Sequence, residues 1–476
     1  MDFADEIKNL GVLKVVTRAA KKLKFPTYLV GGYVRDLALG KQGKDLDLVC
    51  VGSGIDLANM VSTLLPAPTK VTIFKNFGTA MLTYDGYELE FVGARKESYR
   101  KSSRKPIVEN GTLEDDQNRR DFTINAMAIS LNSQDYGLLI DPFDGMMDLK
   151  RKLIKTPLDP EVTFSDDPLR MMRAIRFATQ LEFDIEADTF RAITQYAGRL
   201  EIVSRERITD ELNKILLTDK PSYGFKLLFI SGLLQVFFPV LAKLHGVEKI
   251  GNMAHKDNFY HTLQVLDNIC KHTDNLWLRW AALLHDIAKP ATKRFDPKAG
   301  WTFHGHEDKG ARMVPKIFRQ LRLPLDDRMK YVQKMVRLHL RPIALVNKQV
   351  TDSAIRRLIY EAGDDLEDLM TLCRADITSK NNEKVKKYLR NFDKVEKRVL
   401  AVEENDQVRN FQPVITGEII MKTFGIPPSK MVGEIKEALK EAVLDGEVKN
   451  EYAQALNFIL KLGQSKGLQA KDSKQI

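Results

Sequence analysis

The chain has 476 residues with 43% hydrophobic and 8% aromatic side chains, enough to bury the cores of about two to four domains. Its cysteines lie far apart without CxxC spacing, which excludes a disulfide framework and a thiolate zinc site and favours a reducing compartment. No segment resembles a signal peptide or a membrane span, so we expect a cytoplasmic protein without a membrane partner, and its formal charge of +10 modestly favours a polyanionic partner.

The first 150 residues alternate short strand-like runs with helical ones, and strands are predicted at TYLV, DLDLVCV, TAMLTYD, YELEFVGA and AMAISL. From about Leu153 the strand signals stop and amphipathic helical patterns dominate, as in PLRMMRAIRFATQL. We therefore predict an α+β fold with an α/β head, followed by a chain that is almost wholly helical. The charged tail after Leu462 is expected to be disordered.

The segment from Tyr28 to Val51 joins a glycine turn to two aspartates. After the strand that ends at Val30, Gly31 and Gly32 allow the backbone to approach a ligand closely. A short helix is predicted over Tyr33–Leu39, stopped by Gly40. The free N–H groups at its start can face phosphate oxygens.

Asp45 and Asp47 stand one residue apart in a predicted strand, so both carboxylates point to the same face. Two carboxylates on a rigid strand suit a hard divalent ion such as Mg²⁺. On a neighbouring strand Glu88 and Glu90 share one face, and we favour Glu90 as a third ligand. The alternative is a solvated aspartate pair beside a loop.

Further along the head, the basic segment Arg95–Lys105 is expected to form a solvated, mobile loop. Such a loop is compatible with closing over a triphosphate or a nucleic-acid end. The motifs RRDFTINA, from Arg119, and DPFDGMMDL, from Asp141, follow.

These motifs occur in a recognisable order. The succession GGYVRD, DLD, RRDFTINA, DPFDGMMDL, DDPLRMMRAIRF and RERITDEL, over roughly residues 25–215, resembles the class II tRNA nucleotidyltransferases (CCA-adding enzymes) and bacterial poly(A) polymerases. The resemblance implies a polymerase-beta-like nucleotidyltransferase head in which Asp45 and Asp47 are catalytic and hold Mg²⁺. It implies triphosphate contacts from Gly31, Gly32 and Arg35. Ribose and phosphate contacts are implied for Arg119, Arg120, Asp121 and Asn125.

Asp167 and Arg170 stand three residues apart at a helix predicted to begin near Pro168, so they can share a face. A carboxylate accepts hydrogen bonds and a guanidinium donates them, which matches the amino group and unprotonated ring nitrogen of cytosine and adenine but not uracil or guanine. From the residues alone, Asp167 is equally a helix N-cap and Arg170 a surface partner. The resemblance implies base recognition by this pair, although the preceding position, commonly Glu in the family, is Asp166 here.

Most of the histidines fall in a second region, where an H…HD…D order resembles HD-domain metal phosphohydrolases. Imidazole and carboxylate together suit a divalent transition metal such as Ni, Mn or Co. The resemblance implies a phosphodiesterase or phosphatase acting on damaged 3′ ends, whereas the alternative is a decayed HD fold that serves only as an RNA-facing scaffold. The candidate ligands are His261, His285, Asp286, His306, His339 and Asp376.

The resemblance divides the chain into a catalytic head (1–150), an all-α neck with base recognition (151–235), an HD domain (236–385) and a helical arm (386–476) that binds the tRNA acceptor region. The predicted activity is addition of CMP and AMP to tRNA 3′ ends from CTP and ATP without a template, by two-metal phosphoryl transfer. The alternatives are a poly(A) polymerase, a CC- or A-adding enzyme, or an HD hydrolase with a non-catalytic, RNA-binding head. No protein partner is implied.

Overall fold

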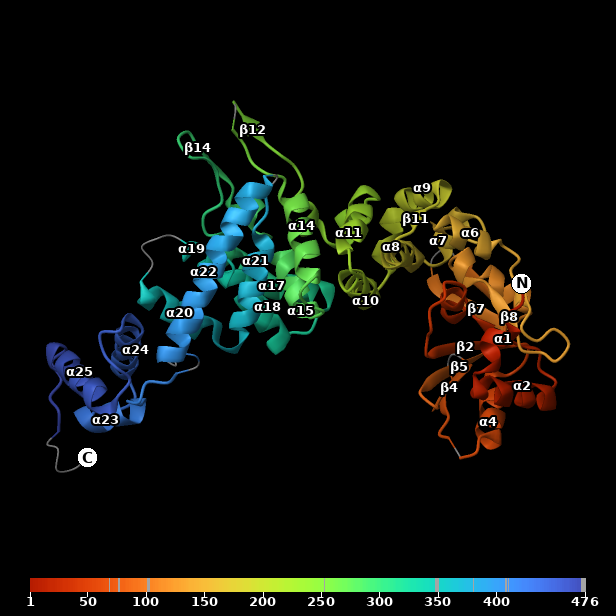
Figure 1. Ribbon diagram of the computed structural model, residues 1–476, viewed down its shortest axis with the longest axis horizontal. Helices are drawn as coiled ribbons and strands as arrows, with labels where there is room; N and C mark the ends of the chain where they lie inside the picture. The colour runs from red at the N-terminus through yellow and green to blue at the C-terminus, as the bar shows by residue number, and fades with distance from the viewer. Residues whose placement is uncertain are drawn as a thin grey trace. The chain divides into compact units, whose positions relative to one another are not determined.

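The structure is a computed structural model that describes residues 1–67, 69–75, 78–100, 103–251, 253–346, 351–379, 381–406, 409 and 411–471. The chain divides into two compact units, Met1–Ala242 and Lys243–Ile476. Figure 1 shows the first unit in red to yellow-green and the second in green to blue. The predicted division into four domains is finer than these two units and stays a prediction.

A seven-stranded sheet forms the head of the first unit, in the order β3-β4-β5-β2-β1-β8-β9. β2 and β5 run parallel, and the other neighbouring strands run antiparallel. All five predicted head strands are confirmed, because their apolar side chains are buried on the sheet, as at Leu46 and Leu48. The strands are β1 (Thr27–Val30), β2 (Asp45–Cys50), β3 (Thr72–Phe74), β4 (Thr79–Tyr84), β5 (Tyr87–Gly93), β8 (Ala128–Ser130) and β9 (Leu139–Ile140).

Helices pack against the sheet and then lead into a helical neck. α2 packs on α4, and α4 packs on β4 and β5. α3 begins directly after Gly31 and ends before Gly40, whose φ of +71° is left-handed, as the sequence predicted. The helices of the first unit are α1 (Ala4–Lys8), α2 (Gly11–Leu23), α3 (Gly32–Ala38), α4 (Gly54–Leu64), α5 (Leu113–Asn118), α6 (Gly145–Arg151), α7 (Pro160–Asp166), α8 (Leu169–Leu181), α9 (Ala187–Tyr196), α10 (Arg205–Leu216), α11 (Pro221–Ile230), α12 (Leu233–Phe237) and α13 (Pro239–Ala242), with 3₁₀ turns at Thr123–Asn125 and Ala197–Ile202.

Two expectations for this unit need correction. The basic segment expected as a loop forms antiparallel strands β6 (Arg95–Arg100) and β7 (Ser103–Asn110), while Lys101 and Ser102 lie outside the described residues. The neck is not wholly α, because β10 (Leu153–Ile154) pairs in parallel with β11 (Asp184–Ile185). Strands of two residues carry no readable period, so only the tertiary pairing reveals them.

The second unit opens with a helical domain. α14 packs on α15 and α21, and α15 and α17 pack on α18. Asp257 and Asn275 cap α14 and α15 by accepting backbone N–H bonds, which explains where these helices begin. The elements are β12 (Lys249–Ile250), β13 (Met253–Ala254), α14 (Asn258–Cys270), α15 (Leu276–Leu284), α16 (Lys289–Thr292), β14 (Arg294–Asp296), β15 (Gly300–Thr302), α17 (His306–Leu321), α18 (Asp327–Leu338), α19 (Arg341–Ala344), α20 (Asp352–Ala362), a 3₁₀ turn (Gly363–Asp365), α21 (Leu366–Asp376) and α22 (Asn382–Asp406). The paired strands β12–β13 and β14–β15 again interrupt a region predicted as helical.

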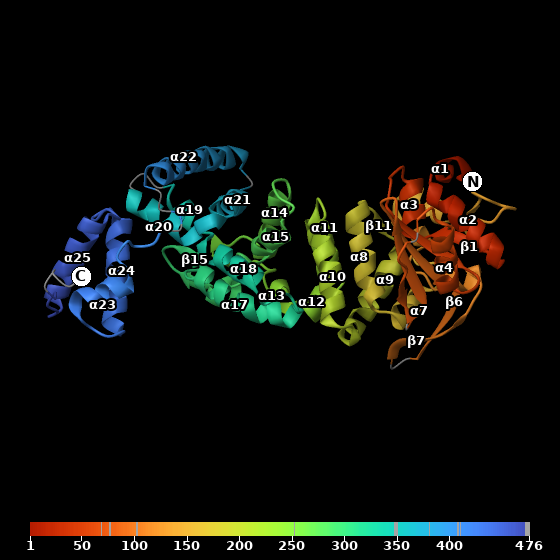
Figure 2. The same cartoon turned by 90° about the horizontal axis from the view of Figure 1, so that it is seen from below.

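Three further helices close the second unit: α23 (Gly417–Phe424), α24 (Lys430–Asp445) and α25 (Tyr452–Ser465). Figure 2 shows them as a blue group. They enclose a shared core that includes Ile435, Leu439 and Ile459. Helix α25 continues past Leu462, where a disordered tail was expected, and residues 472–476 lie outside the described residues. Of the helices in the described part of the chain, none combines the length and apolar character needed to cross a membrane. The predicted α+β fold class is confirmed.

Candidate active site and metal centre

The strand register gathers carboxylates on one face of the head sheet. Asp47 on β2 lies opposite Glu90 on β5, and Asp45 lies opposite Glu88. Facing residues on neighbouring strands point to the same side, so all four carboxylates share a face. Asp45, Glu88 and Glu90 are exposed, and Asp47 is half-buried.

This arrangement resists the ionisation of Asp47. Burial raises the pKa of the Asp47 carboxyl to about 6; Arg120 opposes the rise, and the charges of Glu90 and Asp45 add to it. Burial and the neighbouring carboxylates disfavour the charged form of Asp47, and a cation bound nearby would favour that form. The donor set, carboxylate oxygens alone, is the one that Mg²⁺ prefers.

Gly31 closes the turn directly against this face. Its φ is +75°, and a Cβ at this position would lie 2.8 Å from Asp47 Oδ2 and 3.1 Å from Arg120 Nη1. A Cβ at Gly32 would come no closer than 3.6 Å to Arg35 Nη2, which is an ordinary contact. Within the protein, a Cβ is therefore excluded at Gly31 and tolerated at Gly32, and the close approach of both glycines to a ligand stays a prediction.

Asp116, which the sequence did not single out, holds the two predicted phosphate-binding arginines. Arg119 Nε donates to Asp116 Oδ1 at 2.9 Å, and Arg120 Nε donates to Oδ2 at 3.0 Å. Burial opposes ionisation of Asp116, but Arg120 and Arg119 outweigh it and lower the pKa of the carboxyl. Its position three and four residues before the arginines, on α5, was the available signal.

Arg35 lies in a buried hydrogen-bonded network, and its triphosphate contact stays a prediction. Its side chain is buried, and Nη1 donates to Asn125 Oδ1 at 2.9 Å. Asn125 Nδ2 in turn donates to Asp121 Oδ1 at 3.1 Å, and Arg173 Nε donates to Asp121 Oδ2 at 2.7 Å. Burial raises the pKa of Asp121, but the charge of Arg173 and the bond from Asn125 hold it below its ordinary value. The glycine-turn motif, the RRDFTINA motif and α8 thus share one hydrogen-bonded network.

Asp167 and Arg170 lie at the start of α8, as the sequence predicted. Arg170 Nη2 donates to the carbonyl oxygen of Arg119 at 2.5 Å, so the predicted base reader is tied to the predicted phosphate-binding motif. Asp167 Oδ1 accepts the N–H of Leu169 at 3.2 Å, which is the capping contact that the sequence left open as an alternative. Arg207 Nη2 lies 3.8 Å from Asp167 Oδ2 and was not foreseen.

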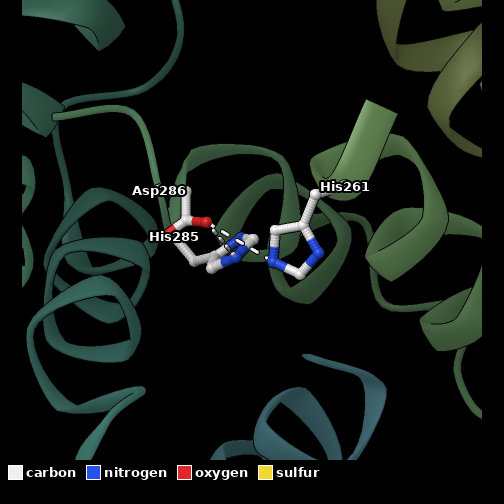
Figure 3. Close-up of side chains that lie close together, drawn as sticks. All are labelled: His261, His285 and Asp286. Carbon is white, nitrogen blue, oxygen red and sulfur yellow. Dashed lines mark ion pairs between the residues drawn. The ribbon is translucent and has the colours of Figure 1, made fainter. Parts of the chain in front are cut away.

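A second site lies in the helical domain of the second unit, where all six predicted HD ligands converge. Asp286 is at its centre. Its Oδ2 lies 3.2 Å from His285 Nε2 and 3.5 Å from His261 Nε2. Figure 3 shows the three side chains close together, with dashed lines for ion pairs between them. Asp286 Oδ1 lies 3.2 Å from His306 Nε2 and 4.0 Å from His339 Nε2. The two oxygens of one carboxylate therefore face two separate pairs of imidazoles.

Asp376 completes the first of these groups. Its Oδ1 lies 3.0 Å from His261 Nε2 and 3.7 Å from His285 Nε2. In the described part of the chain, groups of three ligand atoms within 4.8 Å of one another occur here, and the head carboxylates do not form such a group.

The imidazoles are oriented for metal binding. The Nδ1 atoms of His285, His306 and His339 lie 2.8, 2.7 and 2.7 Å from backbone carbonyl oxygens, which accept the Nδ1–H bonds. Among the residues that the structure describes, these three Nε2 atoms are buried and form no hydrogen bond of good geometry, although Asp286 oxygens lie 3.2 Å from those of His285 and His306. Buried polar atoms that lack partners are costly unless a ligand supplies one, and carbonyl-anchored imidazoles are usual around protein metals. The residues present therefore fit a metal ion.

Charges within this centre are strongly perturbed. Burial lowers the pKa of His285, but Asp286 and Asp376 outweigh it and raise the pKa to about 9. Burial and the charge of His285 lower the pKa of His339 to about 4. Lys289, which the sequence did not identify, places its Nζ 2.6 Å from Asp286 Oδ2. Lys289 lies one helical turn after Asp286, which was the signal that could have identified it.

The chain matches known families over three segments. Residues 27–155 match the poly A polymerase head domain, residues 182–244 match the probable RNA and SrmB-binding site of polymerase A, and residues 258–380 match the HD domain.

Relatives that share 30–35% sequence identity with this chain include three kinds of enzyme. An A-adding tRNA nucleotidyltransferase of Deinococcus radiodurans is 35% identical over 71% of this chain and 76% of its own length. A CC-adding tRNA nucleotidyltransferase of Thermus thermophilus is 30% identical over 90% of this chain and 93% of its own. A multifunctional CCA protein of Pseudomonas fluorescens is 33% identical over 63% and 71%. A solved tRNA nucleotidyltransferase, complexed with a primer tRNA and an incoming ATP analog, is 28% identical with a TM-score of 0.56 and covers 80% of this chain and 99% of its own.

The chain therefore belongs to the class II tRNA nucleotidyltransferase and poly(A) polymerase family, in the form that carries an HD domain. Within that family it is a nucleotidyltransferase that acts on tRNA.

Proposed function

We propose that this enzyme adds both CMP and AMP to tRNA 3′ ends, using CTP and ATP and no nucleic-acid template. One observation carries the catalytic part: Asp47 and Glu90 face one another across paired strands while the Gly31 turn and Arg120 lie against Asp47. A carboxylate face beside an open backbone turn is what transfer of a nucleotidyl group from a triphosphate needs.

Asp45, Asp47 and Glu90 are the residues that would hold Mg²⁺. When bound, the ions supply charge neutralisation at the departing pyrophosphate and activate the attacking 3′-hydroxyl. The chain contributes positioning. Asp116 holds Arg119 and Arg120 in fixed orientations, so these guanidiniums meet phosphate oxygens with little loss of conformational freedom.

Base choice is assigned to Asp167 and Arg170. The guanidinium bond to the Arg119 carbonyl supports this role, because it fixes Arg170 relative to the motif proposed to hold the phosphates. Cytosine and adenine each offer an amino donor beside an unprotonated ring nitrogen, and the pair meets both groups. Uracil and guanine present a carbonyl and a ring N–H instead, so an acceptor would face the Asp167 carboxylate and a donor would face the Arg170 guanidinium.

The test supplies purified protein and Mg²⁺ with tRNA that lacks A, CA or the whole CCA end, and adds each labelled NTP separately. The proposal expects incorporation of CMP into the two shorter ends and of AMP only after CC. Comparable incorporation of UMP or GMP would contradict the base-selection argument. If Asp45→Ala retained transfer, the Mg²⁺ assignment would be wrong.

Addition of A alone is a second candidate. It is favoured by the 35% identity to the A-adding relative over most of both chains. The same assay separates the two, because an A-adding enzyme extends only tRNA that already ends in CC.

A hydrolytic activity of the HD centre is proposed beside transfer. What supports it is the division of the Asp286 oxygens between two imidazole pairs, because these are the residues that would hold divalent ions and such ions would supply Lewis-acid activation of a phosphoester and of water. The ligands would be His261, His285, Asp286 and Asp376 on one side and Asp286, His306 and His339 on the other, and the chemistry is phosphoester hydrolysis at RNA 3′ ends.

Hydrolysis is tested with bis(p-nitrophenyl) phosphate and p-nitrophenyl phosphate after loading with Mn²⁺, Ni²⁺ or Co²⁺, and with bound metal measured by mass spectrometry. Loss of hydrolysis and metal in His285→Ala, with transfer intact, is the expected result. A protein that hydrolyses phosphoesters but transfers nothing would instead be a hydrolase with an RNA-binding head.

A further inference from the structure

The basic excess of the chain gathers on two neighbouring helices of the second unit. α17 and α18 together carry eight lysines and arginines against three acidic residues, which leaves half of the chain's formal +10 on these two helices. The basic residues are Lys309, Arg312, Lys316, Arg319, Arg328, Lys330, Lys334 and Arg337, and the acidic ones are Glu307, Asp308 and Asp327.

A hollow of about 370 Å³ opens between the two helices, which pack side by side in Figures 1 and 2. Gln333 of α18 donates to the carbonyl oxygen of Ala311 on α17 at 2.9 Å, which ties the helices together at the hollow. Of the described residues that line it, Ala311 is the one that is apolar. The polar lining consists of Asp308, Arg312, Lys330, Gln333, Lys334 and Arg337.

Two of these cations are already paired. Lys330 Nζ lies 2.9 Å from Asp327 Oδ1, and Lys334 donates to the carbonyl oxygen of Ala362 at 2.9 Å and pairs with Asp365. Arg312 and Arg337 are exposed and, among the residues that the structure describes, have no ion-pair or hydrogen-bond partner. The hollow therefore offers two guanidiniums to a ligand.

We propose that this hollow docks the phosphate backbone of the tRNA. A guanidinium presents a planar fork of donors that matches phosphate oxygens in pairs, and two such forks suit a phosphodiester chain. Among the described residues that line the hollow, all except Ala311 carry a polar or charged group, so it lacks the large apolar side chains against which an amphipathic protein helix docks. Arg312 and Arg337 lie outside residues 386–476, where the sequence predicted tRNA contacts.

The hollow is separate from the metal centre although the same helices serve both. α17 begins at His306 and α18 ends beside His339, and both imidazoles are buried, whereas Arg312 and Arg337 are exposed. Changes to these arginines are therefore expected to leave the metal ligands in place.

The test compares two double charge reversals in the full-length enzyme, R312E/R337E and K316E/R319E. Both change the net charge equally and both touch α17, but Lys316 and Arg319 do not line the hollow. We expect R312E/R337E to weaken the binding of tRNA lacking CCA by roughly tenfold at low salt, and to reduce the slope of log Kd against log salt by about 1 to 2. K316E/R319E is expected to change the Kd by less than about threefold, because it removes only long-range attraction.

The docking surface would be overturned if both variants weakened tRNA binding equally, or if R312E/R337E bound tRNA as the wild type does. It would also be overturned if R312E/R337E lost binding to anionic lipid vesicles or to an acidic peptide while it still bound tRNA. Thermal unfolding and metal content serve as checks that both variants are folded. The inference rests on tRNA as the substrate, so nucleotide addition is measured at saturating tRNA in parallel. Normal addition with unaltered tRNA affinity refutes the surface alone, whereas a wild-type enzyme that binds tRNA through these arginines but adds no nucleotide refutes the proposed transfer alone.

Discussion

Substituting alanine for Gly31 should disable nucleotide transfer without unfolding the enzyme. Gly31 has φ +75° and ψ −139°, a region that residues with a Cβ rarely adopt, and forcing one there costs roughly 1–3 kcal/mol. For a domain of this size, that corresponds to a fall in Tm of roughly 2–12 °C.

The functional effect should be larger than the effect on stability. The new Cβ would lie 2.8 Å from Asp47 Oδ2 and 3.1 Å from Arg120 Nη1, so the carboxylate and guanidinium must shift away from the turn. A misplacement approaching 1 Å at a reacting centre costs on the order of 100-fold in rate. We expect Gly31→Ala to lose at least that much in kcat for nucleotide addition.

Gly11→Ala is the matched control. Its Cβ would meet nothing within 4 Å among the described residues and it lies at the helical start of α2, outside the nucleotide site, so near-normal rates and Tm are expected. The assay measures single-turnover addition of labelled AMP to tRNA ending in CC, together with thermal unfolding. The reasoning fails if Gly31→Ala keeps the wild-type rate, or if Gly11→Ala loses as much as Gly31→Ala.

Further predictions concern other parts of the two sites. Glu90→Gln should lower the Mg²⁺ affinity of transfer by at least about tenfold, while Glu88→Gln should change it less, because Glu90 lies opposite Asp47; a Mg²⁺ titration that shows equal effects would refute this assignment. Asp121 Oδ2 lies 2.7 Å from Arg173 Nη2, and the pKa of Asp121 in the folded protein lies below its unfolded value near 3.8. The charged carboxylate therefore stabilises the fold above about pH 3.8, and this stabilisation is lost as the pH falls through the folded pKa. Asp121→Asn should accordingly lower Tm most at neutral pH. The gap in Tm between wild type and Asp121→Asn should shrink as the pH falls below about 4, and a constant gap would contradict the linkage. His339→Ala should reduce bound transition metal, measured by mass spectrometry, and leave nucleotide addition unchanged; retention of full metal would remove this residue from the ligand set.

Local patterns predicted much of the head. Alternation of apolar and polar residues along DLDLVCV places Leu46 and Leu48 in the core and Asp45 and Asp47 on the other side, and the structure has this strand and this burial. The helix between Gly31 and Gly40 was likewise predictable, because a glycine with left-handed φ stops it.

Partners distant in the chain were not predictable in the same way. Asp116 as the holder of Arg119 and Arg120, and Arg35 as a buried partner of Asn125, depend on how α5, α3 and the RRDFTINA segment pack. The basic segment after Ala94 was expected as a loop, since its charges hide any strand period, and pairing with residues up to Asn110 makes it two strands.

The sequence by itself determined the strands and helices of the head, the shared face of Asp45 and Asp47, and the kinds of ligand atom available in the HD region, because each follows from spacing within a few residues. Only the tertiary structure decided that Glu90 faces Asp47, that Asp286 divides its oxygens between two imidazole pairs, and that Arg312 and Arg337 border one hollow. The physical reason is that strand register and helix packing are set by burying apolar surfaces from distant parts of the chain against one another. A short window of sequence carries no record of which surface will be its neighbour.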